Sequence, residues 1–237
     1  MSQLKEGRAT RRTTTGTRKL GLGRRSAGFL LLLLTATAAS AAAQEVAQAC
    51  RWLQTPTVGG WAQYRLTAGI ASDTPTVRIA IVGRARLDGI QHFWQETVMQ
   101  SGSSRTIIQT LVPASPYDPT TIRRAIIQTP GQRAMELPPQ ALARLPSGGQ
   151  GSAGADACRR GQPVGWETIV VPAGTFRALH VRYEREGRQA DSWLVPSVPF
   201  ALARSIVVTP GDSTRSVELV LLERGFDATA TLPLPSH

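Results

Sequence analysis

Alternating apolar and polar positions dominate the chain from about residue 58 onward. Within residues 76–83, for example, Val77, Ile79 and Ile81 fall on one face. A period of two residues is typical of a β-strand that buries one of its faces. Twelve such runs together predict about eleven strands, and they cover residues 58–67, 76–83, 91–100, 105–112, 124–128, 133–137, 166–171, 175–186, 189–195, 204–209, 214–224 and 226–232.

Short turn sequences separate these runs. Asp88-Gly89, Ser101-Gly102-Ser103 and Pro130-Gly131 join neighbouring runs in the first half, and Pro172-Ala173-Gly174 does so in the second. Links of two or three such residues favour hairpins, in which the neighbouring strands pair antiparallel. Connections long enough for parallel crossovers are almost missing. The sequence therefore predicts a mainly β, antiparallel fold.

A few segments depart from the strand pattern. Apolar residues recur at helical spacing in residues 45–54, and a second short helix is expected at 139–145. Asp118-Pro119 is a good helix start. The Pro130-Gly131 turn, however, favours a hairpin of residues 124–128 and 133–137 over a helix that starts at Asp118. The Gly- and Ser-rich stretch at residues 146–156 predicts a mobile loop.

The first 43 residues have the three parts of a cleavable export signal. A region with eight basic residues and one acidic residue precedes an apolar run around Leu30–Leu34, and small residues follow at Ala41–Ala43. The alternative, a membrane anchor, needs about 20 apolar residues, and this run has about a dozen. We therefore expect residues 44–237 to form one exported domain, located in the periplasm of a Gram-negative-type bacterium.

The positive charge of the chain lies largely in this leader. The whole chain has 27 basic and 16 acidic residues, a net charge of +11. Residues 1–43 hold 8 of the basic residues and 1 of the acidic ones, so 19 basic and 15 acidic residues follow. The later arginines are scattered singly, without the basic stripe or interleaved aromatic residues typical of nucleic-acid binding. Nucleic acid is therefore excluded as the expected partner.

The chain has two cysteines, Cys50 and Cys158. An even pair in an oxidising compartment favours a disulfide, which would close a loop of more than a hundred residues. Two buried free thiols are the alternative. A lipidated Cys50 is disfavoured, because Gln48-Ala49 is a poor match to the sequence that precedes such a cysteine and Cys50 lies far from the apolar run.

Candidate catalytic and metal-ligating residues are sparse. His92 and Glu96 share a strand face, but no third ligand lies nearby in the sequence, so neither a metal nor another cofactor is expected. His180 is expected to be a packing residue. The Gly-x-Ser-x-Gly signature of serine hydrolases is missing, and neither Asp73 nor Asp191 has the glycine that an aspartic dyad needs. These observations disfavour an enzyme. A hydrolase would need groups such as Asp191 and His180 to meet in a pocket.

Aromatic residues within the strands offer a different possibility. Trp61, Trp94, Trp166 and Trp193 each fall in a predicted strand. On a curved antiparallel sheet, one face can line a cavity while the other packs on helices. The same tryptophans could equally fill a closed core. Periodicity alone leaves both alternatives open.

The second half of the chain resembles a known family. Residues 167–182, which contain Val-Pro-Ala-Gly-Thr-Phe, residues 191–200, which contain Trp-Leu-Val-Pro, and residues 218–226 are similar to LolA/LolB-like periplasmic lipoprotein carriers. The likeness covers about residues 164–226. It implies an incomplete antiparallel barrel wrapped around two or three short helices, with a cavity for acyl chains. It transfers no individual lipid-binding residue.

The resulting hypothesis is a non-enzymatic envelope protein that binds a lipid, a lipoprotein acyl chain or another apolar ligand in a half-barrel cavity. Trp61, Trp94 and Trp193 are the candidate lining residues. The alternative is an envelope module that contacts another protein without a ligand, through a sheet edge or the Gly-rich loop.

Overall fold

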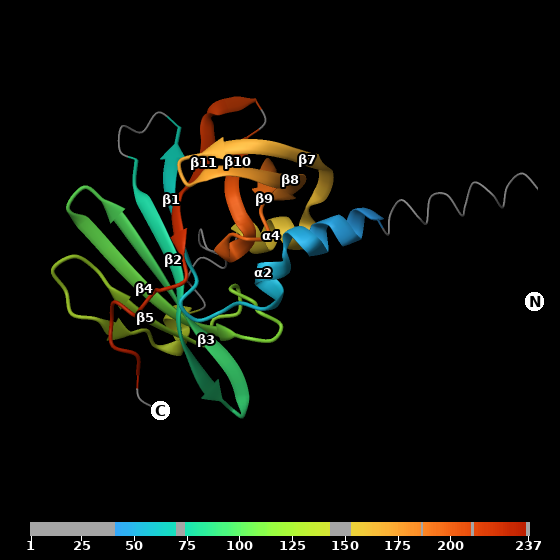
Figure 1. Ribbon diagram of the computed structural model, residues 1–237. Helices are drawn as coiled ribbons and strands as arrows, with labels where there is room; N and C mark the ends of the chain where they lie inside the picture. Colours follow the sequence, from blue (N-terminus) through green and yellow to red (C-terminus); the bar gives the residue numbers. More distant parts are fainter. Residues whose placement is uncertain (1–40, 70–73, 143–152, 186, 210, 236–237) are drawn as a thin grey trace, which may run out of the picture. The chain divides into compact units, whose positions relative to one another are not determined.

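Eleven strands of the described residues form one antiparallel sheet, in the order β6-β5-β4-β3-β2-β1-β11-β10-β9-β8-β7 (Figure 1). The computed structural model describes residues 41–69, 74–142, 153–185, 187–209 and 211–235. The strands are β1 (Trp61–Ala68), β2 (Thr76–Leu87), β3 (Ile90–Ser101), β4 (Ser104–Pro113), β5 (Arg124–Gln128), β6 (Met135–Glu136), β7 (Gln162–Val171), β8 (Gly174–Arg185), β9 (Arg188–Leu194), β10 (Leu202–Thr209) and β11 (Asp212–Gly225).

Two meanders meet at one long-range strand pair. Strands β1 to β6 pair in chain order and form the N-terminal half of the sheet, while β7 to β11 form the C-terminal half. β1 pairs with β11 from Trp61 opposite Gly225 to Ala68 opposite Val217. In the described residues the two outermost strands, β6 and β7, do not pair with each other, so the sheet is not closed. The predicted mainly β, incomplete antiparallel fold of about eleven strands is confirmed.

The helices are short. Residues 41–49 are helical, and α2 (Arg51–Gln54) continues them after a turn at Cys50, as the spacing in residues 45–54 predicted. α3 (Pro139–Leu142) opens the helix expected at 139–145, and η2 (Pro199–Ala201) is a single 3₁₀ turn. None of the described helices is long and apolar enough to cross a bilayer.

α4 (Ala153–Arg160) was not predicted, because its first half, residues 153–156, lies in the Gly- and Ser-rich stretch that was expected to be a mobile loop. Its first residues are small and buried, and a Cβ on Gly154 would lie 2.1 Å from the carbonyl oxygen of Phe200. Small residues let this helix approach η2 closely, so tertiary packing overrides the weak helix propensity. The rest of that stretch, like the leader up to residue 40, lies outside the described residues.

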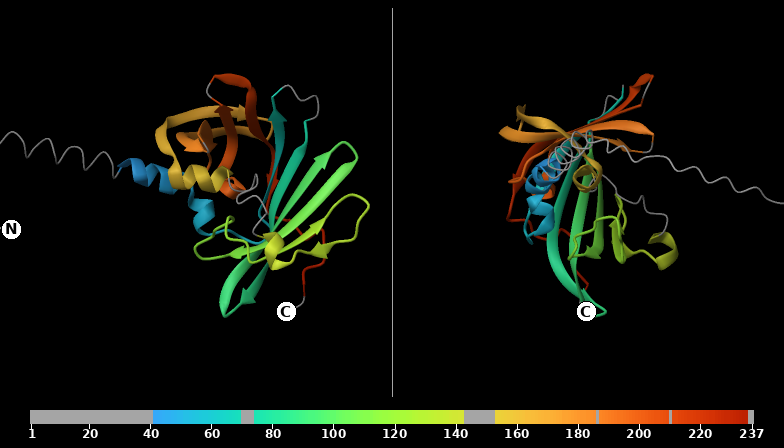
Figure 2. Two further views of the ribbon diagram at one scale, coloured as in Figure 1. Left: turned by 180° about the vertical axis from the view of Figure 1, so that it is seen from behind. Right: turned by 90° about the vertical axis from the view of Figure 1, so that its right-hand side faces the viewer.

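A disulfide joins the two helical segments. Cys50 and Cys158 are bonded, as predicted, across a sequence separation of 108 residues. Beside it, Trp52 of α2 packs on Phe200 of η2 with ring centroids 4.6 Å apart. α4 contacts β8, β9 and β10, and Figure 2 shows these helices gathered on one side of the sheet. We call this side the inner face and the opposite side the outer face.

The inner core lies mainly in the C-terminal half. Leu179, Leu194, Phe200, Leu202 and Leu221 are all nearly inaccessible to solvent there. The predicted faces of β8 are confirmed, with Leu179, Val181 and Tyr183 buried together. The helices therefore fill the hollow of the curved C-terminal half with side chains.

The outer face of the N-terminal half is covered by the end of the chain. Residues 226–235, the C-terminal strap, follow β11 without forming a strand, which corrects the strand predicted at 226–232. Ala228 and Leu232 of the strap are buried against Trp94, Val98 and other apolar residues of the outer face, which form a second core cluster. Thr231 bonds to the Glu96 side chain, and prolines at 233 and 235 lack the N–H groups that a ladder requires.

We predict that loss of the disulfide destabilises the domain strongly. In the chain-entropy account, a loop of about a hundred residues contributes about 4–5 kcal/mol. The double substitution Cys50→Ser and Cys158→Ser should lower the free energy of unfolding by an amount of that order. Urea unfolding followed by circular dichroism measures this change.

Reduced wild-type protein is the matched control, because it keeps both sulfur atoms but lacks the bond. It should be destabilised about as much as the double variant. An unfolding midpoint that does not change on reduction would contradict the prediction.

Candidate functional site

A row of inner-face residues crosses five strands of the N-terminal half. Direct pairing places Ile79 opposite Thr97, Thr97 opposite Ile108, Ile108 opposite Ile127, and Ile127 opposite Met135. Residues directly opposite each other on antiparallel strands lie on the same face of the sheet. Since Ile79 belongs to the inner core, the whole row belongs to the inner face.

Exposure rises steadily along this row. Ile79 is 1% exposed, the next three residues are half-buried, and Met135 at the edge of the sheet is 58% exposed. A second row runs from buried Tyr64 and Val77 to Met99, which is 40% exposed. The inner face is therefore closed near the middle of the sheet and partly open toward β6. We call the open part the open inner surface, and it comprises Thr97, Met99, Thr106, Ile108, Ile127 and Met135.

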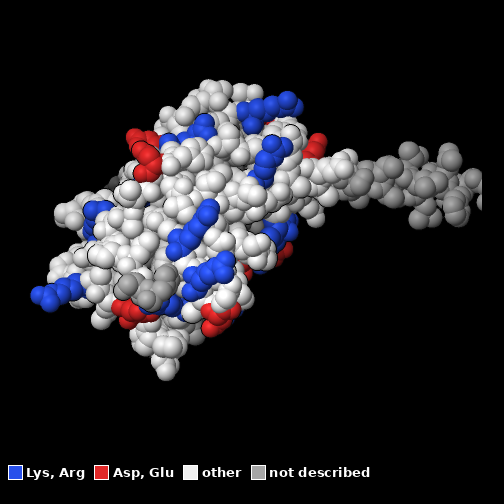
Figure 3. All heavy atoms as spheres, turned by 60° about the horizontal axis from the view of Figure 1, so that its bottom comes forward, with Lys and Arg blue, Asp and Glu red and all other residues white. Residues whose placement is uncertain are grey.

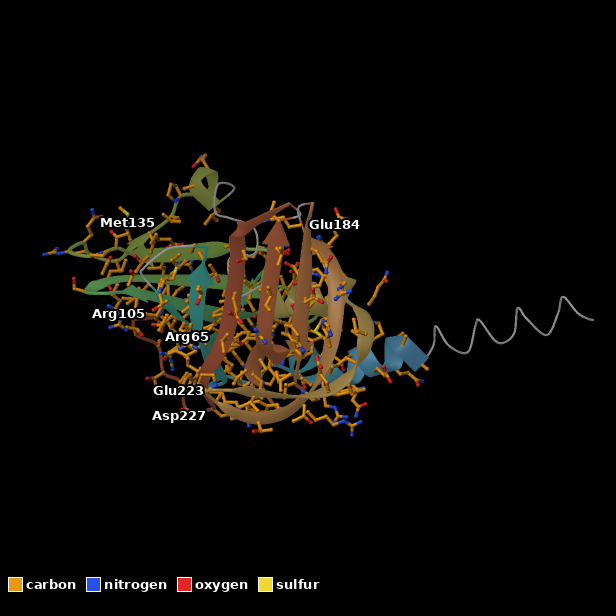
Figure 4. All side chains as sticks on the ribbon, turned by 90° about the horizontal axis from the view of Figure 1, so that it is seen from above. Arg65, Arg105, Met135, Glu184, Glu223 and Asp227 are labelled. Atoms are coloured by element: carbon orange, nitrogen blue, oxygen red, sulfur yellow. A yellow bond between two sulfur atoms is a disulfide. The ribbon has the colours of Figure 1, made fainter. Side chains whose placement is uncertain are left out.

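The chemistry of this surface is apolar with two hydroxyl groups. Isoleucine and methionine side chains supply its area, and Thr97 and Thr106 place hydroxyls among them. Methionine adapts its shape to irregular partners because its side chain is unbranched and polarisable. Figure 4 shows Met135 at the outer end of the N-terminal half, well away from Glu184 in the other half.

Tyr117 forms the inner boundary of the open inner surface. Its hydroxyl donates a hydrogen bond to the Gln95 side chain of β3. Its ring makes edge contacts with Trp52 and Phe93, at centroid distances of 6.4 and 6.3 Å. Burial raises the pKa of Tyr117, and the neighbouring charge of Asp118 adds to this effect, so the hydroxyl stays a donor. The loop that carries Tyr117 thus separates the open inner surface from the filled core.

Asp118 holds this loop in place. Its carboxylate accepts hydrogen bonds from the backbone N–H and hydroxyl of Thr120 and from the hydroxyl of Thr121. Arg159 of α4 lies 3.4 Å away. Burial alone would raise the pKa of Asp118, but these hydrogen bonds and the Arg159 charge outweigh it and lower the pKa. Asp118 was a possible helix start in the sequence, but in the structure it begins a turn that its own side chain stabilises.

Two of the three candidate tryptophans lie on the outer face. Trp94 is 1% exposed beneath the C-terminal strap, and Trp61 packs beside the same cluster. The Trp61 ring nitrogen donates a 2.7 Å hydrogen bond to Asp227, which lowers the pKa of that carboxyl. Figure 4 places Asp227 close to Glu223, where the strap leaves β11.

The third candidate, Trp193, lies in the other half of the sheet. It stacks on His180 with centroids 4.7 Å apart and donates to Glu167. The structure therefore does not bring the three indoles together, and their role in lining a ligand cavity stays a prediction. Sequence periodicity could not separate the two faces of strands that are apolar on both sides.

His180 and Asp191 do meet, but in a structural setting. The ring nitrogen Nε2 of His180 lies 2.6 Å from Asp191, and Glu167 approaches the other nitrogen at 3.6 Å. Burial raises the pKa of Asp191, but hydrogen bonds from Gln189, His180 and Arg182 prevail and lower it. Among the described residues, the polar partners of the ring are two carboxylates. This arrangement accounts for His180 as a packing residue held by a hydrogen bond to Asp191.

Arginine stacking is the feature that sequence analysis missed. A guanidinium group lies over four of the five tryptophan rings, at 4.8 to 5.7 Å from the ring centroid. The pairs are Arg78 with Trp61, Arg124 with Trp94, Arg177 with Trp166, and Arg204 with Trp193. Figure 3 shows one face on which basic side chains stand apart among uncharged and acidic residues. The scattered arginines thus cover aromatic rings.

A separate hollow of about 510 Å³ lies beside the first helix. Its walls include Val46, Leu53, the disulfide and Arg159, together with Ala42 and Ala43. The last two residues fall in the expected cleavage region, so cleavage there would change the walls of this hollow. In the part of the chain that is described, no three His, Cys, Asp or Glu side chains converge on a metal-binding position.

No protein-family model and no curated protein matches the chain. Among solved structures, it is similar to the Pseudomonas aeruginosa MucA/MucB complex, with 11% identity and a TM-score of 0.46, covering 80% of this chain and 58% of that one. A protein described as exported, with a YmcC-like fold, from Bacteroides fragilis has 10% identity and a TM-score of 0.38, covering 71% and 96%.

A LolA superfamily protein from Nitrosomonas europaea has 12% identity and a TM-score of 0.22, with 81% of this chain and 95% of that one covered. The LolA/LolB-like fold that the sequence resemblance implied is thus among the structural neighbours. At these identities and TM-scores the likeness concerns the fold alone.

We predict that Asp118 makes stability pH-dependent at acidic pH. Its pKa in the folded state lies below the ordinary value of 3.8, so its stabilising bonds are present above that pH. They are lost as the pH falls through the lowered folded-state pKa. Asp118→Asn should therefore cost about 1–2 kcal/mol at pH 7, and the difference from wild type should shrink below about pH 4. Urea unfolding between pH 3 and 7 measures both free energies.

Asp88→Asn is the matched control, since Asp88 is exposed in the β2–β3 turn and carries the same charge. Its difference from wild type should stay small across this range. If Asp118→Asn showed an equal loss at every pH, the proposed role of the carboxylate would be refuted.

Proposed function

We propose that this chain is an exported binding protein that holds an acyl chain or another elongated apolar ligand on the open inner surface. The observation that carries the proposal is the row from Ile79 to Met135, which continues the buried inner core into a partly exposed apolar strip. A ligand on this strip would complete the cover that the helices provide in the other half. The sequence resemblance to lipoprotein carriers supports the same ligand class.

The shape of the surface favours a chain-like ligand. Strands lie about 4.8 Å apart, so the row across β2 to β6 is about 19 Å long, which suits a long hydrocarbon chain. Burying the exposed parts of Ile108, Ile127 and the two methionines would contribute about 25 cal/mol for each Å² removed from water. The hydroxyls of Thr97 and Thr106 would tolerate a carbonyl or ester group along the chain.

The polar groups near the open inner surface support a binding function without catalysis. Gln95 bonds to Tyr117, and Thr110 bonds to the backbone of β3. These groups are neutral hydrogen-bonding partners. The carboxylate beside Tyr117, that of Asp118, is occupied by hydrogen bonds from Thr120 and Thr121. The His180 cluster lies on the outer face of the other half, where His180 bonds to Asp191 and stacks on Trp193.

The proposed location is the bacterial envelope. The predicted leader supports export, and the Cys50–Cys158 disulfide is the kind of bond that persists in an oxidising compartment. A periplasmic binding protein would meet lipids and acylated proteins directly. The leader itself lies outside the described residues.

A protein partner is the second candidate, favoured by one observation. β7 is an outermost strand, and its Val164 and Val170 side chains are exposed. Exposed apolar residues on an edge strand favour pairing with an extended segment of another chain. In that function the ligand would be a peptide, and the inner surface would stay unused.

We predict that a charge on the open inner surface abolishes binding of an apolar chain. Met99→Asp and Ile108→Asp should each weaken binding of a fluorescent long-chain fatty acid about tenfold or more, because a carboxylate would lie against hydrocarbon. Binding is measured by fluorescence titration of the mature protein, and native mass spectrometry of detergent-free protein reports any lipid that copurifies.

Two controls locate the ligand. Ile90→Asp places the same charge on a residue that is 57% exposed at the β2–β3 turn, and binding should be unchanged. Ala47→Asp tests the hollow beside the first helix. A loss of binding in Ala47→Asp alone would move the ligand to that hollow. Wild-type protein that binds no probe and copurifies no lipid would contradict the proposed function.

A further inference from the structure

The C-terminal strap is held to the sheet chiefly by side chains. Among the described residues, one backbone–backbone hydrogen bond links it to the rest of the chain, from the Ala228 N–H to the Gly59 carbonyl. Its other polar contacts reach the Trp61, Glu96 and Gln109 side chains. A strand in a ladder would have such backbone bonds at every second residue.

Glu96 is the central anchor. It is fully buried on β3, and its carboxylate accepts bonds of 2.8 and 2.7 Å from the N–H and hydroxyl of Thr231. Gln109 of β4 donates both to Glu96 and to the Leu232 carbonyl, each at 3.0 Å. All recorded partners of the Glu96 carboxylate within the described residues are uncharged. Its burial therefore depends on the strap remaining in place.

The strap covers this part of the outer face but leaves some of its buried polar atoms without a hydrogen-bond partner. The Trp94 ring nitrogen and the Gln109 Oε1 atom are buried and have no protein partner among the described residues. Several strap residues, including Phe226, Thr229 and Thr231, are exposed. Few backbone bonds, exposed side chains and buried polar atoms without partners are the properties of a segment that opens locally.

We propose that the C-terminal strap is a releasable cover, which leaves the outer face as a unit while the sheet stays folded and thereby exposes the apolar surface around Trp94. The inference goes beyond the proposed function, because this surface lies on the face opposite the open inner surface. Its members, Trp94, Val98, Ile107 and Leu111, come from β3 and β4, whose pairing does not involve the strap. The sheet can therefore persist without it.

Hydrogen–deuterium exchange of the full mature protein tests this proposal. In the wild type, the hydrogen-bonded amides of the strap, those of Ala228 and Thr231, should exchange faster than the ladder amides of β2, β3 and β4. Glu96→Gln should raise strap exchange about tenfold or more, because the new amide N–H groups face other donors, while β2 to β4 keep their protection. Glu184→Gln is the control, since Glu184 lies in the other half of the sheet, apart from Asp227 (Figure 4).

A second variant does not change charge. A Cβ on Gly83 would lie 2.4 Å from the Leu234 Cδ1 atom, so Gly83→Ala should push the Leu234 side chain away from β2, loosen the end of the strap and raise its exchange while Glu96 is intact. This variant decides the question if Glu96→Gln fails to fold. In the wild type itself, a common exchange rate for the strap and β3 would overturn the proposal, as would equal acceleration of both in the variants. None of these measurements involves a ligand, so their outcome is independent of the proposed function.

Discussion

The pairing of β1 with β11 is the constraint on which the rest of this structure depends. The two strands are about 150 residues apart in the chain, yet they pair from Trp61 opposite Gly225 to Ala68 opposite Val217. All other strand pairs join neighbours in sequence, which form through local hairpins. The long-range pair turns two meanders into one sheet and gives that sheet continuous inner and outer faces. Among the strand pairs of the described residues it closes the longest loop, so its formation costs the most chain entropy.

A continuous sheet with two apolar faces needs a cover on each of them, and in this chain different segments provide these covers. In the C-terminal half, helices that the Cys50–Cys158 disulfide links fill the inner face. In the N-terminal half, the C-terminal strap covers the outer face. The Tyr117 loop covers the middle of the inner face through its bond to Gln95. The open inner surface is the part of the inner face that the helices and the Tyr117 loop leave uncovered.

Much of the fold could be predicted from the sequence, because strands with one buried face have a period of two and hairpin turns have recognisable residues. The positions of β2, β5 and β8 and the hairpin at residues 124–136 follow from such local signals. α4 could not be predicted in this way, since its glycine and alanine residues favour a helix only when η2 packs against them. The strap was mistaken for a strand for a related reason. Its apolar residues face the sheet like those of a strand, but its partners are the side chains of Glu96 and Gln109.

The candidate site was harder to predict than the fold. Tryptophan within a strand indicates burial, but β3 is buried on both faces, so its period does not tell which face Trp94 occupies. The registers resolve this question, since Thr97 pairs with Ile79 on the inner face while Glu96 and Trp94 lie on the outer one. The structure also shows the role of several scattered arginines, which cover tryptophan rings. Guanidinium groups stack flat on indole rings and remain hydrated at their edges, which lysine does less well.

Strands β3 and β4 contribute residues both to the open inner surface and to the outer-face surface beneath the strap. Thr97 and Met99 face the open inner surface, while Glu96 and Val98, their neighbours in sequence, face the strap. On β4, Ile108 lies on the inner face and Gln109 bonds to Leu232 of the strap. A ligand that changes the twist of these strands would move the anchors of the strap, and departure of the strap would move the lining of the inner surface. Because linkage is reciprocal, any effect of strap release on inner-surface affinity must equal the effect of the ligand on strap release. The alternation of side chains along two strands thus places residues of the two surfaces next to each other in the sequence.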